Sequence, residues 1–552
     1  MTDEISIALA QLNPKVGDLD GNAEKIRAAR QRASLDKADL LVTSELMLTG
    51  YPPEDLVLRA AFQEASEKKV RMLAKETRDG GPAMLIGSIW CEKNQLYNAA
   101  IFLDDGEIKS IRYKHDLPNY GVFDEKRVFK EGPLPGPVNI RGVRVGVMIC
   151  EDMWAPDVTE CLQESGAEFL VVLNGSPYSM EKWDQRLTLA AARVGESGLP
   201  LIYVNQVGGQ DELVFDGGSF AIGNDRIMKA RCPDWIEEVQ ITNWDREQNG
   251  WQCTFGKCAV SEGKIDSIYS AMILGLRDYV EKNKFPGVLV GLSGGIDSAL
   301  TTSVAVDALG ANKVSCVMMP SPYTSTQSLD DAKSCAALLG VKLDEVNIGP
   351  AMAAFEKMTH DVFLGAPPDT TEENIQSRSR GITLMALSNK LGSMLISTGN
   401  KSEMSVGYAT LYGDMCGGFS VLKDVYKTLV FDLCRWRNRN KPHNSHGPEG
   451  MVIPESIITK PPSAELRADQ KDEDSLPPYS ILDEVLTCLV EKDLGVEDTI
   501  ACGHDRDLVT SIWRMLVKAE YKRRQAPPGV KISERSFGGD RRYPITDGFM
   551  DG

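Results

Sequence analysis

The chain has 552 residues, of which 42% are hydrophobic and 25% charged, and this length is too great for a single core, so we expect two or more globular domains. The net charge of −18 argues against a nucleic acid substrate, and no apolar run approaches the roughly 20 residues that span a bilayer. The twelve cysteines form no C-x-x-C pair, which argues against zinc ribbons and disulfide frameworks, and the acidic N-terminus lacks the layout of a signal peptide. We therefore expect a cytoplasmic protein that acts neither on nucleic acid nor at a membrane.

In the first half of the chain, predicted strands and helices alternate. Strands are expected over 5–12, 39–45, 83–90, 96–103, 107–114, 143–150, 169–174, 201–205, 214–222 and 226–230, and helices over 22–33 and 183–195. Two pairs of these strands are predicted to form hairpins, namely 96–103 with 107–114 and 214–222 with 226–230. This mixture predicts a mixed α/β sandwich.

Three reactive side chains stand at the ends of predicted strands, where α/β folds expose residues to a ligand: Glu45, Lys114 and Cys150. A carboxylate can take the proton of a thiol, and a lysine can stabilise the oxyanion formed when the thiolate attacks an amide. Taken singly, Cys150 is also compatible with a core position, and Glu45 and Lys114 with a surface ion pair. The first 359 residues contain a single histidine, His115, which leaves little scope for a Cys-His pair.

The segments around these three residues resemble the catalytic motifs of the nitrilase superfamily, and they read L-L-V-T-S-E-L, Y-K-H-D-L-P and G-V-M-I-C-E-D-M-W. The resemblance covers roughly residues 4–260. It implies an αββα sandwich in which Glu45 is the general base, Lys114 supports the oxyanion and Cys150 is the nucleophile. Glu125 is a weaker candidate for the second glutamate that many members of this superfamily use.

The two halves of the chain meet in a region without clear periodicity, which covers residues 231–262 and contains Trp235, Trp244 and Trp251. Flexible linkers lack such aromatic residues, so we expect a connector packed between domains. Apolar residues at helical spacing over 265–280 predict that a second domain begins at about residue 263.

The second half is organised around a glycine-rich loop between an apolar strand, 288–292, and a helix, 298–309. The loop consists of Gly291, Leu292, Ser293, Gly294, Gly295, Ile296, Asp297 and Ser298. Such a turn directs backbone N–H groups and a helix N-terminus at one point, which favours phosphate. Asp297 would repel phosphate unless a divalent cation lies between them, and this suggests Mg²⁺. An ordinary strand-to-helix turn, capped by a side chain of the loop, is the alternative.

Further strands are expected over 313–319, 343–348 and 394–397, with a helix over 328–339, and this alternation predicts a doubly wound parallel sheet. The string S-G-G-I-D-S resembles the PP-loop of ATP pyrophosphatases, which cleave ATP to AMP and pyrophosphate. The segments M-P-S-P-Y-T-S, E-N-I-Q-S-R, S-T-G-N-K-S-E, Y-G-D-M and E-Y-K-R-R-Q-A-P-P-G resemble the NAD synthetase family in the same order along the chain.

The second resemblance implies roles for several residues. Thr398 contacts ATP together with the glycine-rich loop, and Glu403 shares Mg²⁺ with Asp297. Asn374 and Lys522, again with Glu403, bind the deamido-NAD substrate. Weaker candidates are Arg378, Lys427 and Ser463. Residues 397–403 are also compatible with a polar loop, and the charged stretch 467–474 with either a solvated loop or a lid over the substrate.

Together the two resemblances imply glutamine-dependent amidation of deamido-NAD with ATP as co-substrate, in which Tyr120, Ser176 and Lys182 hold glutamine. The family also implies a homo-oligomer. An amidotransferase for a different carboxylate and a non-catalytic NAD-binding regulator are the alternatives, although a regulator would need none of the reactive side chains. Because ammonium is not a nucleophile, we also hypothesise an enclosed path for ammonia between the two active sites.

Overall fold

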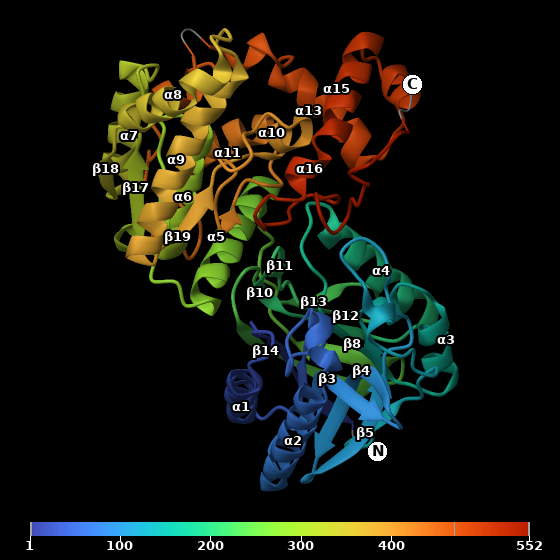
Figure 1. Cartoon of the computed structure of the whole chain (residues 1–552). Coiled ribbons are helices and arrows are strands. Elements are labelled where there is room, and N and C mark those ends of the chain that lie inside the picture. The colour runs from blue at the N-terminus through green and yellow to red at the C-terminus, as the bar shows by residue number, and fades with distance from the viewer. Residues whose placement is uncertain (1–2, 468–469, 550–552) are drawn as a thin grey trace. The chain divides into compact units, whose positions relative to one another are not determined.

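The computed structural model describes residues 3–467 and 470–549 (Figure 1). The chain divides into two compact units, Met1–Gly263 and Lys264–Gly552.

The first unit contains two β-sheets. One sheet has seven strands in the order β15 (Gly250–Phe255), β14 (Glu238–Glu247), β1 (Glu4–Gln11), β2 (Leu40–Thr43), β3 (Ala83–Glu92), β4 (Gln95–Asp104) and β5 (Glu107–Tyr113). The other has six strands in the order β13 (Met228–Arg231), β12 (Phe220–Ile222), β9 (Leu201–Asn205), β8 (Phe169–Asn174), β7 (Val143–Ile149) and β6 (Val138–Ile140). A separate hairpin pairs β10 (Val207–Gln210) with β11 (Leu213–Asp216).

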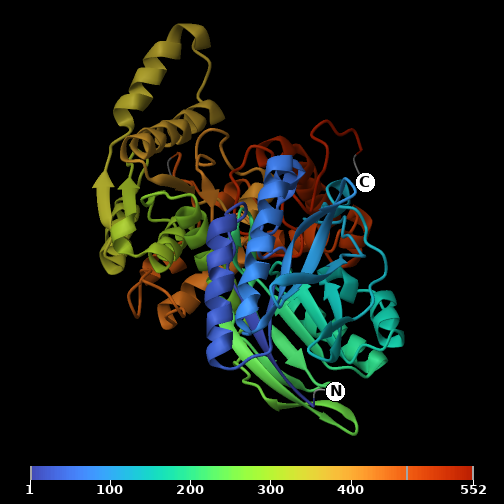
Figure 2. The ribbon, with the colours of Figure 1, turned by 90° about the horizontal axis from the view of Figure 1, so that it is seen from below.

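The alternation of side chains along each strand divides the first unit into layers. In β1, Ile7 and Leu9 belong to the core between the two sheets, whereas Ala8 and Ala10 face the core under two helices. These helices, α1 (Leu19–Leu35) and α2 (Ala60–Glu76), lie side by side on the seven-stranded sheet (Figure 2). Helices α3 (Asp157–Glu164) and α4 (Lys182–Ser197) cover the six-stranded sheet. The expected αββα sandwich is therefore confirmed.

Two expectations for this unit are wrong. Residues 231–262 are not an irregular connector, because they include β14 and β15, and Trp244 and Trp251 are buried between the sheets against Phe169. The expected strand 214–222 is two strands, since Gly217 and Gly218 adopt left-handed φ angles of 73° and 59° and break the extended backbone between them.

The second unit is built on a five-stranded sheet in which every pairing is parallel. Its order is β18 (Lys342–Glu345), β17 (Val314–Met318), β16 (Val288–Gly291), β19 (Met394–Ser397) and β20 (Phe419–Ser420). The strand order reverses between β16 and β19, so the chain leaves these neighbouring strands in opposite directions along the sheet. Ligands of open parallel sheets bind at such a switch point, outside the carboxyl ends of the strands.

The second unit also contains helices, and several of them, among them those over 349–363 and 370–391 and those after residue 478, were not predicted from the sequence. The helices are α5 (Lys264–Lys282), α6 (Ile296–Leu309), α7 (Thr326–Leu339), α8 (Gly349–Phe363), α9 (Thr370–Leu391), α10 (Lys401–Val406), α11 (Lys427–Arg439), α12 (Glu455–Thr459), α13 (Tyr479–Leu486), α14 (Val496–Ala501), α15 (Arg506–Lys518) and α16 (Glu520–Arg523). Helices α13 to α15 share a separate apolar core that includes Leu482 and Leu516. Within the described residues, no helix is both long and apolar enough to cross a bilayer.

Candidate functional site

The first unit contains a buried cluster of one lysine and two glutamates, in which Glu45 comes shortly after β2 and Lys114 directly after β5. The Lys114 Nζ donates to Glu45 Oε1 at 2.7 Å and to Glu125 Oε1 at 2.8 Å. Asn98 Nδ2 also donates to Glu45 Oε1, at 2.7 Å, and the Tyr51 hydroxyl donates to Glu125 Oε1 at 2.9 Å. A buried charge is tolerated only when it is paired and hydrogen-bonded, and this cluster meets both conditions.

Close backbone packing fixes the position of Glu45. The chain leaves β2 and turns at Leu46, whose φ is 46°, and the N–H of Gly175 donates to Glu45 Oε2 at 2.9 Å. At Gly87, on the adjacent strand β3, a Cβ atom would lie 2.3 Å from the carbonyl oxygen of Ser44. Only glycine fits at this position, and the fit lets the turn that carries Glu45 rest directly on the neighbouring strand.

Cys150 follows β7 directly and is the first residue of a 3₁₀ turn, Cys150–Met153. Its φ of 48° is unfavourable for a residue with a side chain, and such strained positions cluster at active sites. Burial raises the pKa of the Cys150 thiol, and Glu45 raises it further while Lys114 lowers it. The thiol therefore needs a base before it can attack, and Glu45 is the carboxylate with the strongest electrostatic effect on it.

Lys114 carries the positive charge of this cluster at neutral pH. Burial alone would lower its pKa, but Glu125 and Glu45 outweigh burial and raise it. Burial raises the pKa of Glu125, whereas Lys114 lowers it. Chemically, such a set of a thiol, carboxylates and an ammonium group is able to act as nucleophile, base and stabiliser of a developing oxyanion.

The three residues expected to hold glutamine also lie in the first unit. The half-exposed Tyr120 donates its hydroxyl to Glu151 Oε1 at 3.0 Å, and the Lys182 Nζ lies 4.2 Å from the ring centroid of Trp154. The side chain of Ser176 is buried and accepts a hydrogen bond of 3.1 Å from Arg186 Nε.

Sequence reasoning missed several polar residues that hold this site, among them Asn98, Asp152 and Arg186. Asn98 interrupts the otherwise apolar run Leu96–Leu103. Arg186 forms a buried ion pair of 2.8 Å with Asp216. For Asn98 this position was the available signal, because burial of a polar residue in an apolar segment requires a partner.

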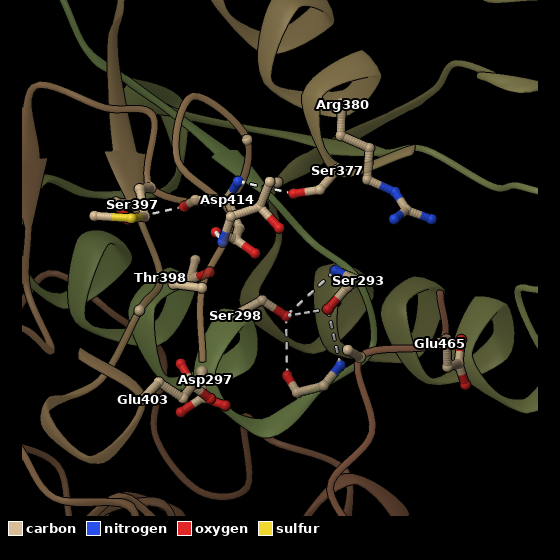
Figure 3. Close-up of a pocket in the computed structure, with 18 of the residues that line it drawn as sticks. Ser293, Asp297, Ser298, Ser377, Arg380, Ser397, Thr398, Glu403, Asp414 and Glu465 are labelled. Atoms are coloured by element: carbon tan, nitrogen blue, oxygen red, sulfur yellow. Dashed lines mark hydrogen bonds between the residues drawn. The ribbon is translucent and has the colours of Figure 1, made fainter. Parts of the chain in front are cut away.

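The second unit contains a cavity of about 590 Å³ at the switch point between β16 and β19 (Figure 3). Its wall includes all the residues expected to bind ATP or deamido-NAD, which are Gly291, Leu292, Ser293, Gly294, Gly295, Ile296, Asp297, Ser298, Asn374, Thr398, Glu403 and Lys522. The weaker candidates Lys427 and Ser463 line it too. Arg378 does not belong to the wall, and its Nε donates to the carbonyl of Leu411 at 3.2 Å.

The glycine-rich loop connects β16 to α6 and is held by its own serines. The N–H of Ser293 donates to Ser298 Oγ at 3.2 Å, and Ser298 Oγ donates to the carbonyl of Gly295 at 2.9 Å. Gly294 has a φ of 81°, and a Cβ atom there would lie 2.2 Å from the carbonyl oxygen of Ser328. The loop and the N-terminus of α6 line the cavity, and a helix N-terminus is a position suited to phosphate.

The carboxylates of Asp297 and Glu403 lie close together at another side of the cavity (Figure 3), and both pair with Lys427. The Lys427 Nζ forms an ion pair with Asp297 and lies 3.4 Å from Glu403 Oε1, while Asn400 Nδ2 donates to Asp297 Oδ1 at 2.9 Å. Burial raises the pKa of Glu403 to about 8, although Lys427 opposes the shift. Burial would lower the pKa of Lys427, but the two carboxylates outweigh it and raise that pKa.

The donor set suits a Mg²⁺ ion that also binds phosphate. Within the described residues no group of three or more His, Cys, Asp or Glu side chains could hold a metal by itself. Mg²⁺ in nucleotide sites is usually held by one or two carboxylates together with phosphate oxygens and water. Asp297 and Glu403, which converge on the same ammonium group, fit this pattern.

The remaining wall of the cavity comes from the end of the sheet and from later segments. The Lys522 Nζ donates to the carbonyl oxygens of Gly407 and Ala409, at 2.7 and 2.6 Å. Of the charged stretch 467–474, residues 468–469 lie outside the described residues. Asp472 of this stretch lines the cavity and accepts a hydrogen bond of 2.9 Å from the Tyr479 hydroxyl. Arg380 and Glu465 also line the cavity but were not predicted.

Known protein families match both units of the chain. The family model described as carbon-nitrogen hydrolase matches residues 6–250, and the model described as NAD synthase matches residues 268–526. A protein of Rhodobacter capsulatus named glutamine-dependent NAD(+) synthetase is 48% identical over 551 residues, with 100% of each chain covered. A protein of Acinetobacter baylyi with the same name is 44% identical over 544 residues, with 98% of each chain covered. A solved structure of glutamine-dependent NAD+ synthetase from Acinetobacter baumannii in complex with ADP has 40% identity and a TM-score of 0.78, with 100% of each chain covered.

Proposed function

This chain belongs to the family of glutamine-dependent NAD(+) synthetases, and from this premise we propose that it makes NAD from deamido-NAD, ATP and glutamine. The first unit hydrolyses glutamine and supplies ammonia. The second unit uses ATP to activate the carboxylate that ammonia attacks. The products are NAD, glutamate, AMP and pyrophosphate, so the protein is a carbon–nitrogen ligase.

The observation that carries the first half-reaction is the Lys114 ammonium held between Glu45 and Glu125. Glu45 and Lys114 are close enough to the strained Cys150 to shift the pKa of its thiol. Glu45 takes the thiol proton as Cys150 Sγ attacks the side-chain amide carbon of glutamine. Lys114 stabilises the oxyanion. The C–N bond then breaks, the leaving nitrogen takes the proton from Glu45, and water hydrolyses the remaining glutamyl thioester. Tyr120, Ser176 and Lys182 are proposed to hold the glutamine.

In the second unit, the nicotinate carboxylate of deamido-NAD attacks the α-phosphate of ATP, which forms an acyl adenylate and releases pyrophosphate. Ammonia then attacks the acyl carbon and AMP leaves. This activation is needed because a free carboxylate is a poor electrophile. We assign the phosphates to the loop from Gly291 to Ser298 together with Thr398, and the deamido-NAD to Asn374, Glu403 and Lys522.

Asp297 and Glu403 are the residues proposed to hold Mg²⁺, which when bound would offset the negative charge on the leaving pyrophosphate. Lys427 lies against both carboxylates and supplies positive charge at the same place. Asp297, Glu403 and Lys427 can therefore help to hold the phosphates of ATP against the glycine-rich loop.

The decisive experiment compares two nitrogen donors. We expect Cys150→Ala to lose NAD formation from glutamine and to retain it with an ammonium salt, because Cys150 serves only the first half-reaction. AMP and pyrophosphate should appear only when deamido-NAD is supplied, and their release with another carboxylate instead would favour a different amidotransferase. Binding of NAD without any turnover by the wild-type protein would favour a non-catalytic regulator.

We propose that the protein acts in the cytoplasm. The twelve cysteines are all free, which fits a reducing cytoplasm. We also propose that the chain forms a homo-oligomer, as its family implies, and light scattering of the purified protein would test this.

A further inference from the structure

A buried carboxylate stands two residues after Cys150 and has no part in the chemistry described above. Asp152 is 1% exposed. Its Oδ1 accepts hydrogen bonds from the backbone N–H groups of His115, at 2.9 Å, and Asp116, at 2.8 Å, while its Oδ2 accepts one from Ile149 at 2.9 Å. Three backbone donors therefore converge on one side chain.

These donors come from the two segments that carry the reactive groups. Ile149 is the last residue of β7 and immediately precedes Cys150, whereas His115 and Asp116 immediately follow Lys114. The backbone N–H of Lys114 donates to the carbonyl of Asn98 at 2.9 Å, and its own carbonyl accepts from Gly132 at 2.8 Å. Those bonds hold Lys114 to its neighbours, while the bonds of Asp152 join the lysine segment to the turn of the nucleophile.

We propose that Asp152 is a positioning residue of the glutaminase site, which fixes the Lys114 ammonium relative to the Cys150 thiol. This inference rests on the proposed function of the first unit. If Asp152 served only to stabilise the turn that begins at Cys150, its hydrogen bond from Ile149 would be sufficient. The two hydrogen bonds from His115 and Asp116, which follow Lys114, add nothing to the stability of that turn. Hydrogen bonds to an ionised acceptor are roughly twice as strong as neutral ones, which suits a residue that must hold a strained turn in place.

Replacement of Asp152 by asparagine separates the hydrogen bonds to His115 and Asp116 from the hydrogen bond to Ile149. In Asp152→Asn, the carbonyl oxygen can still accept from His115 and Asp116, but the amide nitrogen then faces the N–H of Ile149, and two donors repel each other. In Asp152→Ala all three bonds are lost. Because burial raises the pKa of Asp152 to about 7, the wild-type reference is measured at about pH 8.5, where the carboxylate is mostly ionised.

We expect Asp152→Asn to lower kcat with glutamine by about 10²-fold, the cost of a misplacement of about 1 Å, with KM for glutamine changed by less than about twofold. Asp152→Ala should lower kcat with glutamine further, because it removes all three hydrogen bonds. Synthesis from ammonium should be unchanged in both variants. The matched control is Asp157→Asn, which removes the same charge from an exposed position on α3 and should behave as wild type.

A second readout reports the position of Lys114 without turnover. Iodoacetamide alkylates the thiolate, and Lys114 favours the thiolate of Cys150. Alkylation of the Cys150 peptide, followed by mass spectrometry, should therefore be slower in Asp152→Asn than in the control. A variant with unchanged kcat per folded molecule and unchanged alkylation, but a lower melting temperature, would overturn the proposal and leave Asp152 a purely structural role. Failure of the proposed function is distinguishable, because it would appear as glutamine-dependent activity in Cys150→Ala.

Discussion

Replacement of Lys114 by methionine tests the central ion cluster of the first unit. Methionine has a similar length and removes the ammonium, so Glu45 and Glu125 remain buried without their shared cation. Removal of one partner from a buried ion pair typically costs about 3–5 kcal/mol. At roughly 2–4 °C per kcal/mol, this corresponds to a fall of roughly 6–20 °C in the melting temperature of the first unit.

The loss of stability should depend on pH. Burial raises the pKa of Glu125 in the folded protein, and removal of Lys114, which lowers that pKa, should raise it further. A carboxyl group whose folded-state pKa is raised stabilises the fold only while it is protonated, and this stability is lost as pH rises through the folded-state pKa. The variant should therefore differ from wild type more at pH 8 than at pH 5.5.

The same variant should lose glutamine-dependent synthesis by at least about 10²–10³-fold, the usual cost of one oxyanion-stabilising group. The assay measures NAD formed from glutamine and from ammonium in the same preparation, and calorimetry at the two pH values measures the transition. Retained glutamine activity would refute the role of Lys114. A destabilisation that is equal at both pH values would refute the electrostatic argument.

Three further predictions concern the second unit and the transfer of ammonia. Asp297→Asn and Glu403→Gln should each cripple synthesis with either nitrogen donor and weaken its dependence on Mg²⁺, and normal rates at normal Mg²⁺ concentrations would contradict the assignment. Gly294→Ala should lower kcat with both donors by at least about tenfold, because the added Cβ atom would lie 2.2 Å from the carbonyl oxygen of Ser328. The control is Gly340→Ala, where φ is also positive but no atom lies within 4 Å of the added Cβ atom, so that it reports backbone strain alone. If ammonia is transferred without release, ¹⁵N-amide glutamine should label the carboxamide of NAD almost completely in the presence of unlabelled ammonium too dilute to drive synthesis. Dilution of the label to the bulk ratio would show that ammonia escapes.

The sequence by itself determined the local elements whose signal lies within a few residues. The apolar runs of β8 and β19 and the glycine-rich loop were predictable, because burial and left-handed turns impose strong constraints on residue type. The candidate residues Glu45, Lys114 and Cys150 were also visible, since each lies at the end of a predicted strand. The roles given to them came from side-chain chemistry together with the family resemblance.

Tertiary structure alone decided what these residues contact. Strand β14 pairs with β1, although most of the first unit's sequence lies between them. No local pattern in 231–262 could therefore predict this pairing. Trp244 is buried because of it. Asp152 meets His115 only because β7 and the end of β5 bring their following turns together. Likewise, Lys427 reaches Asp297 from a helix 130 residues later in the chain. Contacts of this kind depend on how the chain folds back on itself, and the periodicity of any single segment carries no information about them.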